Sequence, residues 1–211
     1  IYISGGNNNT VKVKRSYLST IRTGSISTIN SDKNVIYESV QTGIYALATH
    51  VIYAQIDAGL NSAKLQGSGR LTWWGLNIYD ASFYRSKNSS TDFALDLKYQ
   101  RSFSGSSIAN RSADEMKKNG VSEAQAILWG KELASLLPNV EPGQTLTAIY
   151  SPRQGTVFYH DGKQIGKIPG LDFSKAFFGI WFDPNTSAPK LRADLIGRGC
   201  PPPIFNEACN Q

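Results

Sequence analysis

The spacing of apolar residues indicates a β-strand over residues 73–84. Apolar and polar side chains alternate from Leu76 to Phe83, which is typical of a strand with one buried face. Tyr79 falls on one of the two faces, and Gly75 inside the same strand is expected to mark a bulge or a close backbone approach. This tyrosine is then either a core residue with its hydroxyl at a rim or part of a pocket.

The same alternation, together with turn residues, predicts further strands. A strand over 92–101 would place four large side chains on one face: Phe93, Leu95, Leu97 and Tyr99. The residues 141–144 form the pattern of a type II turn, which leads into a strand over 145–150. Asp161-Gly162 then predicts a hairpin between the strands on either side of it.

Helical spacing follows each group of strands. Ser104 is a candidate N-cap for one helix, and Ser122 opens a capping box at the start of the next. Asp172 is the expected cap of a helix over 173–181 that is apolar on all sides, and Ser187 the expected cap of the last helix. Strands and helices in separate blocks predict an α+β fold, an antiparallel sheet with helices packed on one face.

The two ends of the chain carry weaker patterns than its middle. Because the first residue is Ile1, we expect an N-terminus that is processed, trimmed or translated from a frame open upstream. The apolar residues 43–54 are either a remnant of a signal-peptide core or, as we prefer, an ordinary helix or strand. We expect a poorly defined N-terminal extension over 1–55, one domain over 56–198 and a Pro/Cys tail over 199–211.

Composition narrows the choice of partners. The chain is 40% hydrophobic and 18% charged, as in soluble globular proteins, and no apolar run is long enough to span a bilayer. The net charge of +6 would suit an anionic partner, but the lysines and arginines are scattered and form no nucleic-acid motif. We therefore expect no nucleic-acid partner and no integral membrane segment.

The cysteines bear on the compartment. Cys200 and Cys209 enclose a short loop, so they form either a disulfide in an oxidising compartment or two free thiols. We expect a periplasmic or secreted protein, with the cytoplasm as the alternative.

Few residues are available for cofactor or metal chemistry. The histidines are His50 and His160, and the chain has no HExxH, no CxxC and no Gly-rich phosphate loop. We therefore expect no cofactor, no metal site, and no catalytic arrangement built on histidine.

What remains is a set of aromatic and arginine side chains. The predicted sheet and helices would bring these residues together as ligand-binding candidates: Tyr79, Tyr99, Arg101, Arg111 and Trp181. An arginine at the mouth of an apolar pocket could hold a carboxylate or a phenolate. The simpler alternatives are a strand-end side chain for Arg101 and an i,i+4 ion pair with Glu115 for Arg111.

A family resemblance depends on several segments in order: 67–71, 74–81, 93–101, 108–116, 142–147 and 176–192. Together they resemble a bacterial chalcone isomerase-like family over roughly residues 57–197. The resemblance implies an open-faced sandwich with a cleft between sheet and helices. In plant-type isomerases an arginine and threonine and tyrosine hydroxyls assist ring closure of a chalcone. Relatives without that set include fatty-acid-binding proteins, which hold a carboxylate with an arginine and a tyrosine.

The resemblance departs from the enzymes at one position. Trp74 stands where the enzyme strand has its threonine, and an indole cannot supply that hydroxyl. We therefore expect a non-catalytic protein that binds a small amphipathic ligand, a fatty acid or a phenolic compound. The alternatives are an isomerase or intramolecular lyase for an enone-like substrate, and a structural or interaction protein whose cleft is filled by its own aromatic side chains.

Overall fold

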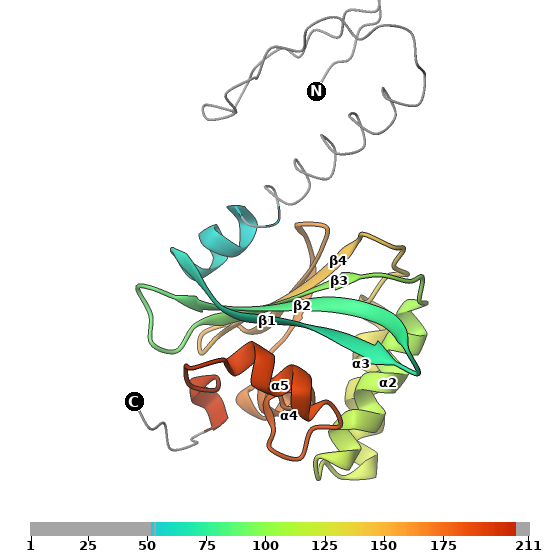
Figure 1. Cartoon of the computed structure of the whole chain (residues 1–211). Coiled ribbons are helices and arrows are strands. Elements are labelled where there is room, and N and C mark those ends of the chain that lie inside the picture. The colour runs from blue at the N-terminus through green and yellow to red at the C-terminus, as the bar shows by residue number, and fades with distance from the viewer. Residues whose placement is uncertain (1–51, 53, 206–211) are drawn as a thin grey trace, which may run out of the picture. The chain divides into compact units, whose positions relative to one another are not determined.

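One antiparallel sheet forms the centre of the structure (Figure 1). The computed structural model describes residues 52 and 54–205, and the statements below concern these residues. The six strands lie in sequence order, each antiparallel to its neighbours. They are β1 (Ala63–Trp73), β2 (Leu76–Ser86), β3 (Phe93–Tyr99), β4 (Thr145–Ser151), β5 (Gly155–His160) and β6 (Lys163–Ile168).

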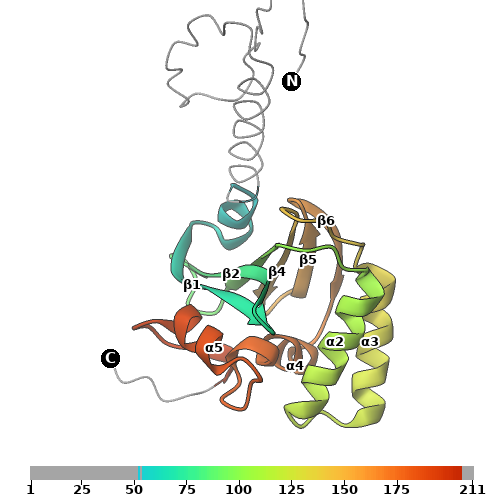
Figure 2. The same cartoon turned by 45° about the vertical axis from the view of Figure 1, so that its right-hand side comes forward.

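Two pairs of helices follow two groups of strands, as predicted. The helices are α2 (Gly105–Lys118) and α3 (Glu123–Leu136) between β3 and β4, then α4 (Leu171–Phe182) and α5 (Pro189–Ile196) after β6, with a 3₁₀ turn η1 (Pro203–Phe205). Figures 1 and 2 show α4 and α5 along one side of the sheet, with α2 and α3 side by side next to them. The α+β open-faced sandwich is confirmed. Within the described residues, no helix is both long and apolar enough to cross a membrane.

The main core lies between the sheet and these helices. The inward side chains of β3 are the four that the alternation predicted, and all are buried. The α4 helix is buried as its apolar sequence predicted, and its phenylalanines pack against the sheet. A second, smaller cluster lies on the opposite face, where Ile56 and Leu60 of the helical residues 54–60 pack with Ala94 and Ile149.

The predicted single strand over 73–84 is wrong, because a hairpin turn interrupts it. Trp73 ends β1 and pairs with Leu76 at the start of β2. The two residues between them, Trp74 and Gly75, have φ angles of +50° and +76°, as two-residue hairpin turns require. The alternation hid this turn, since its residues include no Asn, Asp, Ser or Pro, and Gly75 resembled a bulge.

Local capping signals were partly reliable. Ser104 and Ser122 are confirmed as N-caps, since their hydroxyls accept the backbone N–H groups of Ser107 and Gln125. The Asp161-Gly162 turn is also confirmed, with φ angles of +47° and +79°.

The predicted N-caps of the last two helices, α4 and α5, are wrong. The N-cap of α4 is Gly170, and no side chain caps it, so Asp172 lies within the first turn. The N-cap of α5 is Ala188, because Pro189 begins the helix one residue later than expected. Ser187 is therefore free to bond elsewhere.

Two glycines let α5 approach β1 closely. A Cβ atom at Gly67 would lie 2.8 Å from the carbonyl carbon of Leu195, and one at Gly69 would lie 2.7 Å from the Cβ atom of Asp194. Backbone and Cβ atoms cannot turn aside as a flexible side-chain end can, so any larger residue would displace the helix.

We predict that Gly67→Ala lowers the free energy of unfolding by about 1–3 kcal/mol, the usual cost of overpacking. Urea unfolding measures the effect. Ser68→Ala is the control, since Ser68 is exposed on the opposite face of the same strand, and it should change stability by less than about 0.5 kcal/mol. Equal effects of the two variants would contradict the close approach.

A buried carboxyl lies on the face of the sheet opposite α4. Asp96 of β3 is 9% exposed and accepts a hydrogen bond from the Thr147 hydroxyl at 2.6 Å. Burial raises the pKa of Asp96 from 3.8 to about 6, and the bond from Thr147 opposes this only in part. The native state therefore holds a proton between these two pH values that the unfolded state has released. Stability is therefore lost as the pH rises from about 4 to the folded-state pKa of about 6, above which both states are ionised.

We predict that Asp96→Asn, which keeps the acceptor oxygen but cannot ionise, stabilises the protein near pH 8 by about 1–3 kcal/mol. Near pH 4 the gain should be small, because native Asp96 is then protonated and the pH is close to the unfolded pKa of 3.8, so that little of the ionisation difference remains. Urea unfolding at both pH values tests this, with Asp114→Asn as the control for an exposed carboxylate on α2. A gain of equal size at both pH values would show that ionisation is not its cause.

Candidate functional site

A cavity of about 600 Å³ lies between the sheet and helices α2, α4 and α5. Its walls are mostly apolar, and the sheet contributes Leu71, Tyr79, Leu95, Leu97, Tyr99, Leu146 and Phe158. The helices and the loop between α4 and α5 contribute Ile108, Arg111, Ser112, Glu115, Phe177, Ile180, Trp181, Ser187 and Leu191. The volume falls within the range of small-molecule sites, about 300–1,000 Å³.

The structure brings four of the five predicted ligand-binding residues to this cavity. Tyr79, Tyr99, Arg111 and Trp181 all line it. Arg101 is exposed and is not among the lining residues. The alternation predicted a strand that continues to Arg101, but β3 ends at Tyr99. Arg101 is therefore not part of the strand.

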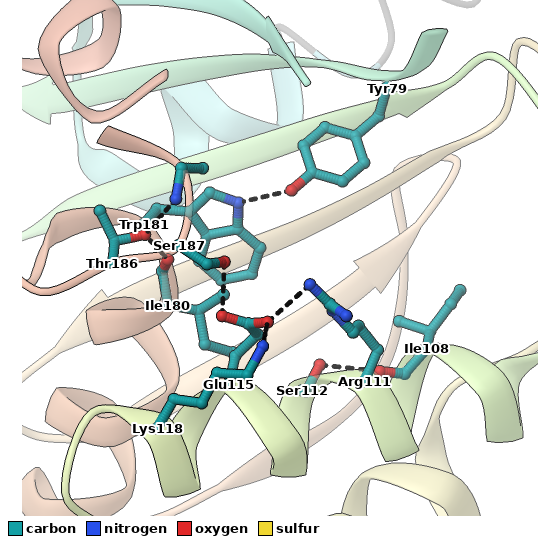
Figure 3. A network of polar contacts seen from close by, with 11 residues as sticks. Tyr79, Ile108, Arg111, Ser112, Glu115, Lys118, Ile180, Trp181, Thr186 and Ser187 are labelled. Carbon is teal, nitrogen blue, oxygen red and sulfur yellow. Dashed lines mark hydrogen bonds and ion pairs between the residues drawn. The ribbon is translucent and has the colours of Figure 1, made fainter. Parts of the chain in front are cut away.

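Two buried tyrosines provide neutral hydrogen-bond donors in the cavity wall. The Trp181 Nε1–H donates to the Tyr79 hydroxyl oxygen at 2.9 Å, which leaves the Tyr79 hydroxyl hydrogen to donate in turn (Figure 3). The Tyr99 ring packs edge-on to the Tyr79 ring, with centroids 5.7 Å apart. Burial raises the pKa of both hydroxyls above the ordinary tyrosine value, so both stay protonated at neutral pH.

A charged network on α2 faces the tyrosines. Glu115 is almost fully buried, with a side chain 4% exposed, and three groups contact its carboxylate: Lys118 and Ser187 donate hydrogen bonds and Arg111 forms an ion pair (Figure 3). Arg111 Nη2 lies 2.6 Å and Lys118 Nζ 2.9 Å from Glu115 Oε1. The Ser187 hydroxyl, from the loop before α5, donates to Glu115 Oε2 at 2.6 Å. The ion pair that the i,i+4 spacing of Arg111 and Glu115 predicted is confirmed.

The network keeps Glu115 ionised. Burial by itself would raise the pKa of this carboxyl, but the bonds from Ser187 and Lys118 and the charges of Arg111 and Lys118 outweigh it and lower the pKa below its usual value. Two cations and one anion leave a net charge of +1 beside the apolar cavity. Arg111 still has donors beyond the one that Glu115 uses, because a guanidinium carries five N–H groups. Its Cζ atom lies 5.2 Å from the centre of the Trp73 ring.

The sequence does not identify two residues of this site as site residues. Its pattern predicts a helix cap at Ser187, and nothing local links Ser187 to Glu115, which lies 72 residues earlier in the sequence. Glu115 is indicated only as the i,i+4 partner of Arg111. Its spacing from both Arg111 and Lys118, one helical turn on either side, was the available signal.

The observed cavity does not agree with the filled-cleft alternative. Phe177 and Trp181 form part of its wall, while Phe178 is buried in the core beside it. Within the described part of the chain, no group of three or more His, Cys, Asp or Glu residues could hold a metal ion.

Comparisons with known proteins agree on a fold. The profile of a family described as chalcone isomerase-like matches residues 46–197. An uncharacterized protein of Haemophilus influenzae is 25% identical over 142 residues, which is 63% of this chain and 67% of that protein. The crystal structure of a fatty-acid binding protein of Arabidopsis thaliana is similar with a TM-score of 0.51 and 11% identity. That similarity covers 63% of this chain and 86% of the plant chain, and at this identity it shows the fold alone.

Proposed function

We propose that this chain, which belongs to the chalcone isomerase-like family, binds a small amphipathic anion in the cavity between its sheet and helices. A fatty acid is the first ligand to test. The observation that carries the proposal is the combination of an apolar cavity with a cation and neutral hydroxyl donors in its wall. The fatty-acid binding protein of the same fold supports this choice of ligand.

The two parts of such a ligand would have separate sites. The apolar wall would bind the tail, since each methylene removed from water contributes about 0.8 kcal/mol. The head group would lie at Arg111, whose planar guanidinium can bind a carboxylate through two parallel bonds. Tyr79 and Tyr99 could donate to the same carboxylate because burial keeps their hydroxyls protonated.

Glu115 would tune this head-group site rather than block it. It already bonds one nitrogen of Arg111, so a ligand carboxylate would share the guanidinium with it. Lys118 shares Oε1 of Glu115 with Arg111 and Ser187 holds Oε2, so both carboxylate oxygens already have partners within the protein. The net charge of +1 then favours a single anionic group.

The isomerase alternative has less support. The residue expected in place of the enzyme threonine, Trp74, lies on an exposed turn and does not line the cavity. Arg111 and the tyrosine hydroxyls could stabilise an oxyanion, but the same groups serve binding equally well. Nothing in the described residues favours catalysis over binding.

We predict that Arg111→Gln weakens binding of dodecanoic acid about 10- to 100-fold, the worth of a charge-assisted hydrogen bond. Binding of dodecanol should change less than about threefold, because the alcohol carries no charge for Arg111 to neutralise. Isothermal titration calorimetry measures both affinities.

Arg101→Gln is the matched control, because it removes an identical side chain that lies outside the cavity. It should leave both affinities unchanged. Equal losses for acid and alcohol in Arg111→Gln, or an equal loss in the two variants, would contradict a head-group role for Arg111. No binding of either ligand by the unmodified protein would sink the proposed ligand class.

We also propose an oxidising compartment, periplasmic or extracellular. Cys200 is disulfide-bonded, and the other cysteine of the chain, Cys209, lies outside the described residues. Disulfides persist in such compartments and are rare in the cytosol. We expect protein that is alkylated in cell lysate under denaturing conditions to carry no alkylated cysteine by mass spectrometry, whereas two alkylated cysteines would contradict this.

A further inference from the structure

The turn between β1 and β2 presents large apolar side chains to solvent. Trp73 is 51%, Trp74 88% and Leu76 45% exposed. We refer to these three residues as the hairpin tip. Single exposed apolar residues are common on protein surfaces, but two adjacent tryptophans and a leucine within four residues of one turn are an unusual concentration of exposed apolar side chains.

No contact within the described residues explains why position 74 is a tryptophan. Its φ of +50° belongs to the left-handed region, which Asn, Asp and Gly adopt readily and bulky residues rarely do. Because the side chain remains 88% exposed, burial does not compensate for this conformation. A turn residue that bears such a conformation without compensating burial often marks a site of function.

Cationic side chains lie beside the hairpin tip. Arg111 Cζ is 5.2 Å from the centre of the Trp73 ring. Arg101 follows Gln100, whose N–H bonds to the carbonyl of Ile78 near the start of β2. Arg101 is exposed, and among the ion pairs of the described residues none includes it.

We propose that the hairpin tip binds the surface of a lipid bilayer that carries anionic headgroups. Tryptophan prefers the boundary between headgroups and acyl chains, where its ring is in apolar surroundings and its N–H reaches polar ones. Arg101 and Arg111 would meet the anionic headgroups.

The available area favours a bilayer over a protein partner. Three partly exposed side chains offer roughly 400 Å², whereas a stable protein interface needs about 800 Å² from each partner. The patch is also a projecting turn, which can enter a fluid interface without a complementary groove.

The location of the hairpin tip joins this surface to the cavity. Trp73 is both part of the tip and part of the cavity wall, and Figure 1 shows the β1–β2 hairpin ending next to α2, which carries Arg111. An amphipathic ligand could thus pass between bilayer and cavity over a short path. This last step rests on the proposed function, but bilayer binding itself does not.

The test is flotation of the full chain with vesicles of phosphatidylcholine containing 30 mol% phosphatidylglycerol, and with pure phosphatidylcholine vesicles. We expect binding to the anionic vesicles, and at least tenfold weaker partitioning for Trp74→Asn, a residue that suits the turn's positive φ. Leu76→Asn and Leu171→Asn are a matched pair, at 45% and 46% exposure. Leu171 begins α4 and lies away from the hairpin, so only the first variant should weaken partitioning.

Absence of binding to either vesicle would overturn the proposal, as would binding that neither Trp74→Asn nor Leu76→Asn weakens. A dimer in sedimentation that Trp74→Asn dissociates, without vesicle binding, would assign the tip to a second copy instead. Calorimetry with dodecanoic acid in vesicle-free buffer separates the two proposals, since Trp74→Asn should bind the acid as the unmodified protein does. Loss of acid binding in both proteins would contradict the proposed ligand and leave the vesicle result standing.

Discussion

Aromatic packing between α4 and the sheet determines which part of the space between them is a filled core and which part is a cavity. Toward one end of the strands, Phe178 and Phe182 pack against Phe93 and Phe83, each pair with ring centroids 4.7 Å apart. Elsewhere on the same helix, Trp181 reaches the sheet through one hydrogen bond to Tyr79 and forms a wall. The same helix thus fills the core along one part of its length and lines the cavity along another.

The charged network on α2 is stable because the buried carboxylate of Glu115 is fully paired. A carboxylate as buried as Glu115 is costly unless every lone pair finds a donor. Arg111, Lys118 and Ser187 provide those donors from α2 and from the loop before α5. The network therefore connects two elements distant in sequence, and it leaves a positive charge beside an apolar space. An anion with an apolar tail complements both features.

Much of the fold could be predicted from local pattern. Alternation placed the inward side chains of β3 correctly, and the capping serines set the starts of α2 and α3. The resemblance to the chalcone isomerase-like family is confirmed over residues 46–197. The failures occurred where a local signal was absent or ambiguous. A turn of Trp74 and Gly75 lacks polar residues, and Ser187 precedes the helix by one residue more than a cap does.

The sequence by itself determined the elements, their faces and the residue types available for binding, because periodicity and capping act over a few neighbouring residues. Tertiary structure decided which arginine reaches the cavity: Arg111 on α2 lies in its wall, whereas Arg101, beyond the end of β3 at Tyr99, lies outside it. It also decided that Ser187 meets Glu115 and that the hairpin tip stays exposed. These outcomes depend on contacts between elements far apart in the chain, which no local pattern encodes.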